Sequence, residues 1–392
     1  MSGGPAPVPP EDVLNRPVDE ATAELAAGGG DVVRAQLWLG GGSFALRELP
    51  LPVPGPGEVL VRVRSAAVCG SDRHTVAGLR ESPSPGVLGH EGVGEVVALG
   101  TGSVPTDVAG RPLVVGDRAV WSVISACGRC DRCRAERSAK CRDLRKAGHE
   151  PVTGDWPLSG TYATHVLLPA GHDVVRVGPE VSDGAAAISA CAGATVMAAL
   201  EVAARSSTLS SARVLVSGVG MLGLLAVVAL REAGAAAVHA VDPSPARRDL
   251  ALRAGADSTA APADGPRPAD GGTPADDASP QVDVALEFSG ATLSVASVLD
   301  ALDVGGTAVL AGSVFPGPAV DLDPEALVRG WRTVTGVHNY EPRHLAQAVE
   351  LLASPGAEVL SDPEVLSPPM PLEELPRAFT APSAHLRTLV AP

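Results

Sequence analysis

The sequence predicts an α/β protein of two domains, a β-rich domain followed by one built on a parallel sheet. Apolar and polar residues alternate in the first part of the chain, and from about residue 183 the apolar period becomes helical. With 392 residues, the chain is long enough for two domains that each bury their own core. Disulfides are therefore not needed to compensate for small size.

The first domain is expected to cover residues 31–182. Its strand signals are the segments "VVRAQLWLG" and "GEVLVRVRSAAVCGSD", which alternate in polarity between Pro and Gly breaks. Residues 1–30 mix Pro, Gly, Ala and acidic residues, which favours a disordered N-terminal extension.

The second domain is expected to cover residues 183–335. After the helical pattern "GAAAISACAGATVMAALEVA", the segment "RVLVSGVGMLGLLAVVALREAGAAAVHAVD" has the strand, glycine turn, helix and strand order of a βαβ unit. The strands "VDVALEFSG" and "GGTAVLAGSV" continue the sheet, whereas residues 258–281, rich in Pro, Gly and Asp, predict a mobile surface insertion. Residues 336–392 are expected to finish this domain and return to the first.

The net charge of −15 argues against a nucleic-acid or anionic-membrane partner, because phosphate backbones are bound by basic surfaces. The N-terminus has no basic start followed by an apolar stretch, and the apolar run at residues 222–230 is too short to cross a bilayer. We therefore expect a cytoplasmic protein with no membrane partner, whose thiols stay reduced.

Four of the six cysteines lie close together with the spacing C-x2-C-x2-C-x7-C: Cys127, Cys130, Cys133 and Cys141. A disulfide, a redox pair and a metal site are the competing interpretations. The spacing lets a short loop direct four thiolates toward one ion, which favours a structural zinc site. An iron–sulfur cluster is the rival, although no proline follows the last cysteine and no second cluster motif exists. Metal-free thiols are the remaining alternative.

The other two cysteines have suggestive neighbours. Cys69 lies in "VCGSDRHT", His90 lies in "GHEG", and Cys191 lies in "SACAGAT". Together they would form a Cys2His site whose fourth position is left to water or substrate, the arrangement of a catalytic zinc. The choice of these three residues as ligands follows from the family resemblance given below, since their spacing alone does not select them. Taken alone, Cys191 could equally be a small buried core residue. Two zinc ions per chain would account for all six cysteines.

The segment "SGVGMLG" contains a G-x-G-x-x-G motif formed by Gly218, Gly220 and Gly223. It follows a predicted strand, and Met221 begins an apolar helix. That context is the one a dinucleotide requires, because the turn must bring a pyrophosphate close to the backbone at a helix N-terminus.

Cofactor preference is predicted from the end of the next strand. A carboxylate at Asp242 can accept hydrogen bonds from the adenosine ribose and would repel a 2′-phosphate, which favours NAD over NADP. Arg247 lies five residues further on and could reach a phosphate, so NADP remains the less favoured alternative.

The motifs "CGSD", "GHEGVGEV", "CAGAT" and "GVGMLG", with the four-cysteine segment, resemble the zinc-dependent medium-chain alcohol dehydrogenase family in order and spacing. The resemblance extends from about Val32 to the C-terminus. It implies a GroES-like catalytic domain with a structural zinc lobe at 127–141, a Rossmann domain, and an active-site cleft between them. It also implies a homodimer or a homotetramer.

Residue roles follow from the same resemblance. Glu91 matches an acidic neighbour that can approach the metal during ligand exchange, and Ser71 and His74 match a proton relay. Thr195 matches a position that lines the nicotinamide pocket. A surface histidine in a polar turn is the alternative for His74. The implied reaction interconverts an alcohol and an aldehyde or ketone by hydride transfer to or from the nicotinamide.

The segments "LEFSGA", "LAGSVFPGPAVDLDPEALVRGW" and "TVTGVHNYEPRHL" resemble a bacterial subgroup described as phosphonate-associated alcohol dehydrogenases. This resemblance suggests phosphonoacetaldehyde or hydroxyethylphosphonate as substrate. A polyol, an amino alcohol or another specialised-metabolite alcohol is the alternative substrate. A non-catalytic NAD-binding protein, or a zinc-free quinone reductase, on the same fold is a more remote possibility.

A phosphonate needs donors that fork around its oxygens, and Arg is the preferred residue. Candidates in "HNYEPRH" are His338, Asn339, Tyr340, Arg343 and His344. An ordinary surface position is the alternative for Arg343 and His344. Arg73 and Arg80 flank the catalytic loop and are further candidates, and Trp156 matches a region that lines the family's substrate pocket, with a core position as its alternative.

Overall fold

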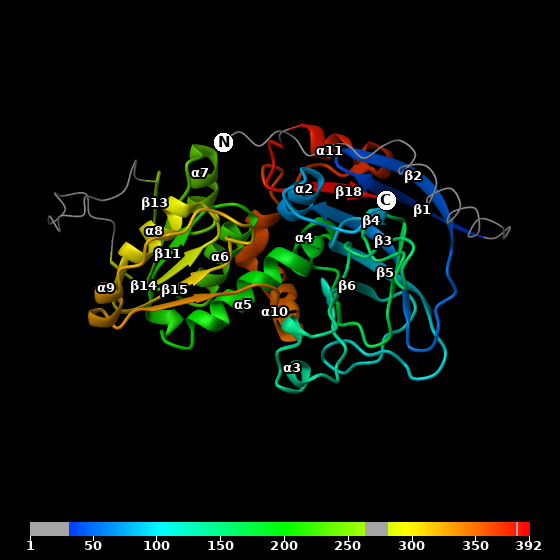
Figure 1. The fold of residues 1–392 in the computed structure, drawn as a ribbon, viewed down its shortest axis with the longest axis horizontal. Coiled ribbons are helices and arrows are strands. Elements are labelled where there is room, and N and C mark those ends of the chain that lie inside the picture. Colours follow the sequence, from blue (N-terminus) through cyan, green and yellow to red (C-terminus); the bar gives the residue numbers. More distant parts are fainter. Residues whose placement is uncertain (1–30, 263–280, 382) are drawn as a thin grey trace. The chain divides into compact units, whose positions relative to one another are not determined.

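The computed structural model describes residues 31–262, 281–381 and 383–392 (Figure 1). The expected extension at 1–30 and most of the expected insertion lie outside the described residues. The chain divides into two compact units. The first unit comprises the chain up to Cys191 together with Glu341–Ala353 and Ser361–Pro392, and the second comprises Ala192–Tyr340 and Ser354–Leu360.

The first unit is built mainly of antiparallel strands. They are β1 (Val32–Gly40), β2 (Ser43–Pro50), β3 (Val59–Val68), β4 (Gly86–Val87), β5 (Glu91–Leu99), β6 (Arg118–Trp121), β7 (Ile124–Ser125), β8 (Arg145–Lys146), β9 (His165–Leu168), β10 (Val174–Arg176), β17 (Met370–Pro371) and β18 (Thr388–Ala391). One sheet has the order β10-β6-β5-β3-β18-β17, with β9 also paired to β3, and two smaller sheets are β2-β1-β4 and β7-β8. The two strands predicted for this region are β1 and β3.

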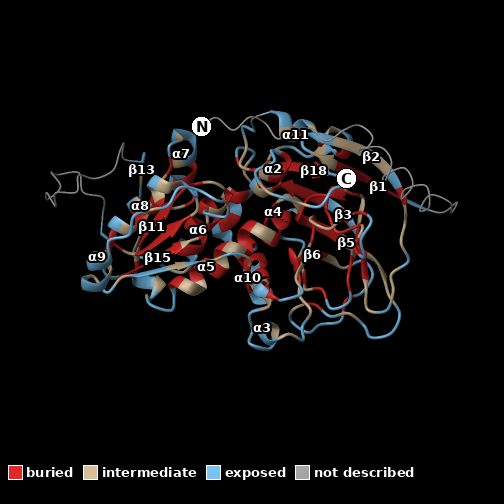
Figure 2. Ribbon diagram, in the orientation of Figure 1, coloured by how far each residue is buried: buried red, intermediate tan, exposed pale blue. Residues whose placement is uncertain are grey.

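Short helices join these strands: α2 (Gly70–Val76), α3 (Asp131–Arg134), α4 (Asp183–Ile188), α10 (Pro342–Leu352) and α11 (Arg377–Thr380), with 3-10 turns at Ser138–Lys140 and Leu372–Glu374. A further 3-10 turn, Pro355–Ser361, belongs to the second unit except for its last residue. Alternation along β3 turns Arg62 and Arg64 to solvent while the residues between them enter the core. Figure 2 shows the buried residues concentrated in the strands. Trp121 and Tyr162 are the largest fully buried side chains of this core.

The second unit contains a six-stranded sheet in which every neighbouring pair is parallel. Its strands are β11 (Arg213–Ser217), β12 (Ala237–Val241), β13 (Ser258–Ala260), β14 (Val282–Glu287), β15 (Leu302–Leu310) and β16 (Thr333–Gly336). The order β13-β12-β11-β14-β15-β16 is the 3-2-1-4-5-6 order of a Rossmann domain. The predicted doubly wound parallel sheet is therefore confirmed.

The helices of the second unit are α5 (Ala194–Ala203), α6 (Met221–Glu232), α7 (Pro245–Arg253), α8 (Thr292–Asp300) and α9 (Pro324–Arg329), with a 3-10 turn at Leu209–Ser211. Helix α6 is apolar almost all round because it contacts β11 and β12 as well as α5 and α7. Strand β13 corrects one expectation, since it begins the segment predicted as a mobile insertion. Its backbone pairs with β12, and this pairing does not require apolar side chains.

The boundary between the units falls within a continuous helical segment, Asp183–Ala203. Residues 183–191 group with the first unit, rather than with the second as expected, because α4 packs on β3 and β5. This segment alone among the described helices is long and apolar enough to cross a membrane by length and composition, and 72% of its apolar window is buried, as in a core helix.

Gly223→Ala should destabilise the second unit. A Cβ at Gly223 would lie 2.0 Å from the Gly218 carbonyl oxygen, whereas a Cβ at Gly220 would meet nothing within 4 Å. The overpacked variant should lose about 1–3 kcal/mol of unfolding free energy, measured by denaturant titration. Gly220→Ala is the matched control and should lose less, about 0.5–1 kcal/mol, because alanine is a poorer helix N-cap than glycine but meets no clash here. Equal stability of the two variants would contradict this packing argument.

Candidate functional site

Asp72 organises the loop that carries the first predicted zinc ligand. Cys69 is the N-cap of α2, and its backbone N–H donates to Asp72 Oδ2 at 3.0 Å. The Tyr162 hydroxyl donates to the same oxygen at 2.8 Å. The other oxygen, Oδ1, lies 3.3 Å from His90 Nδ1, and the Asp72 side chain is fully buried. One carboxylate therefore fixes both Cys69 and His90.

His90 follows a sharp bend at Gly89. Gly89 has φ +92°, and a Cβ there would collide with Thr161 and Tyr162, so only glycine fits. With Nδ1 turned toward Asp72, the Nε2 atom of His90 lies 3.3 Å from Ser71 Oγ. Nε2 is thus the ring nitrogen that remains for a metal, with the carboxylate behind the ring as in carboxylate–histidine–zinc sites.

Cys191 lies in a π-helical turn, Ser189–Gly193, within the helical segment Asp183–Ala203. Such turns occur often at functional sites. The ligand atoms of Cys69, His90 and Cys191 all lie within 4.8 Å of one another. A hydrogen bond between the two thiols lowers the pKa of Cys69 well below its ordinary value and raises that of Cys191. Two sulfurs and one imidazole that converge in this way fit a zinc ion with one open position.

Glu91 and Arg387 form a buried ion pair beside this site. Arg387 Nε donates to one Glu91 oxygen at 2.8 Å and Nη2 donates to the other at 3.2 Å. Arg387 Nη2 also lies 3.9 Å from Cys69 Sγ. Burial raises the pKa of Glu91 to about 7, against the opposing effect of Arg387. Glu91 therefore lies next to the metal ligands, where the family resemblance put it.

The two relay candidates are both on α2. Ser71 and His74 are three residues apart, so they share a face of the helix. His74 is partly buried, and this burial lowers its pKa. Thr195, the predicted nicotinamide contact, belongs to α5 in the second unit and is partly exposed.

The four-cysteine segment also converges. The ligand atoms of Cys127, Cys130, Cys133 and Cys141 lie within 4.8 Å of one another, and all six cysteines of the chain are free thiols. The Cys130 sulfur is 3.5 Å from that of Cys133, well beyond the length of a disulfide bond. Backbone donors at Arg142 and Cys133 lower the pKa of Cys130 to about 6, which favours a thiolate at neutral pH. This donor set fits a closed structural zinc site.

A carboxylate from the C-terminal part of the chain anchors this zinc lobe. Glu341 accepts hydrogen bonds from the backbone N–H groups of Ser138 at 3.0 Å and Ala139 at 2.9 Å, and from the Ser138 hydroxyl. Glu341 is also the N-cap of α10. The sequence around Ser138 gave no sign of this contact with Glu341, because the two residues are 203 positions apart.

The glycine turn lies between β11 and α6, at the carboxyl end of the sheet, where the strand order reverses between β11 and β14. Gly218 has φ +89°, and a Cβ there would lie 2.7 Å from the Ser289 nitrogen. Gly220 is the N-cap of α6, which begins at the buried Met221. The turn is therefore built as the motif predicts, and it fits a dinucleotide pyrophosphate.

Asp242 follows β12. Besides the predicted contact with the ribose, its carboxylate hydrogen-bonds to the protein backbone, which the sequence did not indicate. It accepts hydrogen bonds from the backbone N–H groups of Val219 at 2.8 Å and Ser244 at 2.9 Å, and it is 2% exposed. Arg247 Nη1 lies 3.7 Å from Asp242 Oδ2. The carboxylate thus shapes the glycine turn, and Arg247 is drawn toward it.

The predicted substrate residues are divided between the two units. His338, Asn339 and Tyr340 belong to the second unit, and Tyr340 is 2% exposed, whereas Arg343 lies exposed on α10 in the first. His344 is buried, and its Nδ1 accepts a hydrogen bond from the Glu341 N–H at 3.0 Å, which is a helix-capping role.

Two further candidates are engaged elsewhere. Trp156 is 2% exposed, its indole N–H donates to the Leu167 carbonyl oxygen at 2.5 Å, and its ring packs on His172, so it occupies the core position that was its alternative. Arg73 donates to the Ala378 carbonyl oxygen and to Thr388 Oγ1. Neither side chain is directed to a ligand by these contacts.

Two family models match the chain. The alcohol dehydrogenase GroES-like domain matches residues 55–179, and the zinc-binding dehydrogenase domain matches residues 221–354. A 5-exo-hydroxycamphor dehydrogenase of Pseudomonas putida is 32% identical over 308 residues, which cover 78% of this chain and 83% of that protein. An L-threonine 3-dehydrogenase of Sinorhizobium medicae is 32% identical over 70% of this chain and 75% of its own length.

Solved structures agree with these matches. An alcohol dehydrogenase from Thermotoga maritima has a TM-score of 0.81 at 26% identity, and covers 93% of this chain and 100% of its own. A structure from Sinorhizobium meliloti, described as a zinc-binding dehydrogenase bound to NADP, has a TM-score of 0.78 at 27% identity and the same coverage. The chain thus combines a GroES-like domain with a Rossmann-like domain.

The purified protein should contain two zinc ions per chain by elemental analysis. Cys130→Ser and Cys69→Ser should each lose one zinc, because each removes a ligand from a different site. Only Cys130→Ser should also lower the melting temperature markedly, since a closed zinc site contributes directly to folding. Iron in place of zinc, or loss of both ions from either variant, would contradict the assignment of two independent zinc sites.

Asp72→Asn should weaken zinc binding at the Cys69, His90 and Cys191 site by about 10–100-fold, because the charge behind the imidazole is lost. Competition with a chromogenic chelator measures the affinity. The matched control is Asp143→Asn, which makes the same change at a side chain that is 73% exposed beside the other cysteine cluster. An unchanged zinc affinity in Asp72→Asn would show that this carboxylate does not support the ligands.

Proposed function

Because the chain belongs to the zinc-dependent medium-chain alcohol dehydrogenase family, we propose that it interconverts a small alcohol and its aldehyde or ketone with NAD(H). The observation that carries this proposal is the convergence of Cys69, His90 and Cys191, an open Cys2His donor set, beside Ser71. When bound, zinc would supply a Lewis acid for the substrate oxygen, and the nicotinamide would supply the hydride acceptor or donor.

The protein's own residues would manage the proton. Ser71 Oγ is 3.3 Å from His90 Nε2 and so lies beside the metal position, where it can accept the hydroxyl proton of an alcohol. His74, three residues further along α2, would then pass a proton toward solvent. The Arg387 guanidinium contacts both Glu91 and Cys69, so it would fix the position of the Glu91 carboxylate beside the zinc ligands.

NAD is the proposed cofactor. The buried Asp242 carboxylate at the end of β12 supports this preference, because it would repel a 2′-phosphate. Gly218, Gly220 and Gly223 would receive the pyrophosphate, and Thr195 would contact the nicotinamide. NADP is the alternative, since Arg247 lies close to Asp242 and a relative from Sinorhizobium meliloti binds NADP.

A small phosphonate, such as phosphonoacetaldehyde or hydroxyethylphosphonate, is the proposed substrate. The resemblance of "LEFSGA" and "TVTGVHNYEPRHL" to the phosphonate-associated subgroup supports it. A polyol or an amino alcohol is the alternative, and the relatives named for hydroxycamphor and threonine show how widely substrates vary in the family. The homodimer or homotetramer and the cytoplasmic location stay predictions.

The zinc-loaded protein should oxidise NADH when given a small aldehyde, followed by absorbance at 340 nm. Ser71→Ala should lower kcat by about 10²–10⁴-fold, because the proton transfer loses its first acceptor. Ser103→Ala changes the same residue type at an exposed turn and is the control. Absence of turnover with every alcohol and aldehyde tested, with either dinucleotide, would refute the proposed oxidoreductase.

A further inference from the structure

Two cations lie near the Cys2His site without a carboxylate partner. Arg80 is in the loop after α2, and Lys146 ends β8. Both side chains are partly buried. Among the residues that the structure describes, neither side chain forms an ion pair, although most other arginines of the first unit do. Such cations are unusual because partial burial removes water without supplying a counter-charge.

Backbone pairing brings the segment after β8 alongside the segment that leads to His90. Gly86 bridges Pro151, and the Val152 N–H donates to the Pro85 carbonyl oxygen at 2.9 Å. At Gly148 the contact is so close that a Cβ would lie 2.3 Å from the Gly89 carbonyl oxygen. The stretch that contains Lys146 therefore runs next to a metal ligand.

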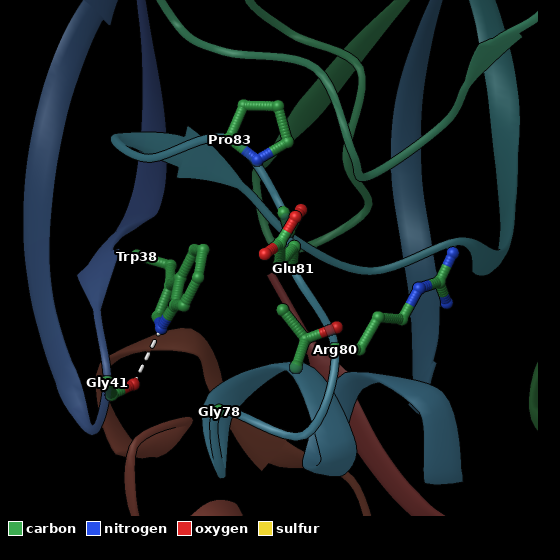
Figure 3. A pocket seen from close by; sticks show the side chains of 8 residues that line it. Trp38, Gly41, Gly78, Arg80, Glu81 and Pro83 are labelled. Atoms are coloured by element: carbon green, nitrogen blue, oxygen red, sulfur yellow. Dashed lines mark hydrogen bonds between the residues drawn. The ribbon is translucent and has the colours of Figure 1, made fainter. Parts of the chain in front are cut away.

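Side-chain contacts continue this arrangement. The His149 ring lies 5.5 Å from the His90 ring, centroid to centroid. On its other side, His149 Nδ1 is 3.4 Å from Ser82 Oγ, two residues after Arg80. Arg80 and Ser82 also line a pocket of about 590 Å³, and Figure 3 shows the Arg80 side chain extending on the side of this pocket away from Trp38 and Gly41. Ser82 and His149 thus connect the loop of Arg80 to the metal ligand.

The positive charges of this region affect the pKa values of the neighbouring basic side chains. The pKa of Lys146 is lowered, first by burial and then by the cations Arg80 and Lys140. Arg80 also lowers the pKa of His149 and of His74, in both cases after burial. The position of this region beside the Cys2His site is given by the close approach of Gly148 to Gly89 and by the contacts of His149 with Ser82 and His90.

The neighbouring carboxylates do not offset this positive charge. Glu81 is exposed on the pocket side of the loop, near Trp38 (Figure 3). Glu150 Oε1 accepts a hydrogen bond from the Lys146 backbone N–H at 2.9 Å and forms no ion pair with the ammonium group. Glu91 is already paired with Arg387.

We infer that Arg80 and Lys146, with the Ser82 hydroxyl, form a subsite for a terminal oxyanion of the substrate, a phosphonate or a carboxylate, beside Cys69, His90 and Cys191. This inference rests on the proposed function and names the substrate class. Arg supplies a fork of donors for two oxygens, and Lys supplies a point charge. Recognition of the anion is thereby assigned to the first unit, and residues 338–344 are not needed for it.

The test compares three aldehydes: phosphonoacetaldehyde, succinic semialdehyde and the neutral butanal. The variants are Arg80→Gln and Lys146→Met, and Arg62→Gln, an exposed arginine of β3 paired with Glu95, is the matched control. Each subsite variant should lower the ratio of kcat/KM for the preferred anionic aldehyde to kcat/KM for butanal by about 10–100-fold, the effect of one charged hydrogen bond. Arg62→Gln should leave this ratio unchanged.

The two anionic aldehydes distinguish the sources of the oxyanion, since preference for one of them identifies a phosphonate or a carboxylate. A purely structural role for Arg80 and Lys146 would lower all rates together and leave the ratio intact, which would overturn the inference. Preference of the unaltered protein for butanal would also overturn it, while the proposed oxidoreductase would stand.

Binding of methylphosphonate and acetate, measured by calorimetry on the zinc-loaded protein, tests the subsite without turnover. The unaltered chain should bind one of them at least about tenfold more tightly than the Arg80→Gln, Lys146→Met double variant. Tighter anion binding by the unaltered chain would support the subsite even if the protein reduced none of the aldehydes. In that case the proposed oxidoreductase would be refuted and the subsite would not. Equal binding by both proteins, or no binding by either, would overturn the subsite.

Discussion

The candidate site depends on one buried carboxylate. Asp72 accepts hydrogen bonds from the Cys69 backbone and the Tyr162 hydroxyl and faces His90, so three separate segments are held by a single side chain. A buried ion is costly unless its lone pairs are satisfied, and here the partners that satisfy it are attached to the ligands themselves. The geometry of the Cys2His site and the stability of this part of the core are therefore set by the same contacts.

Much of the molecule could be predicted from local patterns. The cysteine spacing and the glycine motif each lie in a short segment, so their geometry follows from nearby residues, and alternation identified β1 and β3. Partners far apart in the chain could not be found in this way. Glu91 and Arg387 are separated by 296 residues, and no period or spacing connects them. Residue type also proved ambiguous, because Tyr340 and His344 have the chemistry of ligand contacts but serve packing and helix capping.

The arginines and lysines around the site fall into two groups. Arg387 and Arg73 lie in fixed contacts with the protein, and these contacts connect the C-terminal segment to the loops that carry the ligands. Arg80 and Lys146 have no such partners among the residues described. A cationic side chain that is bound by fixed protein partners stabilises the fold. A cationic side chain that is partly buried without such partners creates a positive electrostatic potential that can attract an anionic ligand. The distinction comes from the contacts, since all four residues look alike in the sequence.

The discontinuity of the first unit affects how the chain is completed during synthesis. Strand β18 pairs with β3, and Glu341 anchors the zinc lobe, so segments translated after the second unit are structural parts of the first unit. The second unit is nearly contiguous, from Ala192 to Tyr340, and its parallel sheet can form while the ribosome is still working. Until β18 has been made, Ala66–Val68 of β3 lack their partner strand on that edge, although β9 can already pair with Val59–Arg62. Its thiol ligands are made early, but the surroundings that hold them are complete only after Arg387 and β18 have been made.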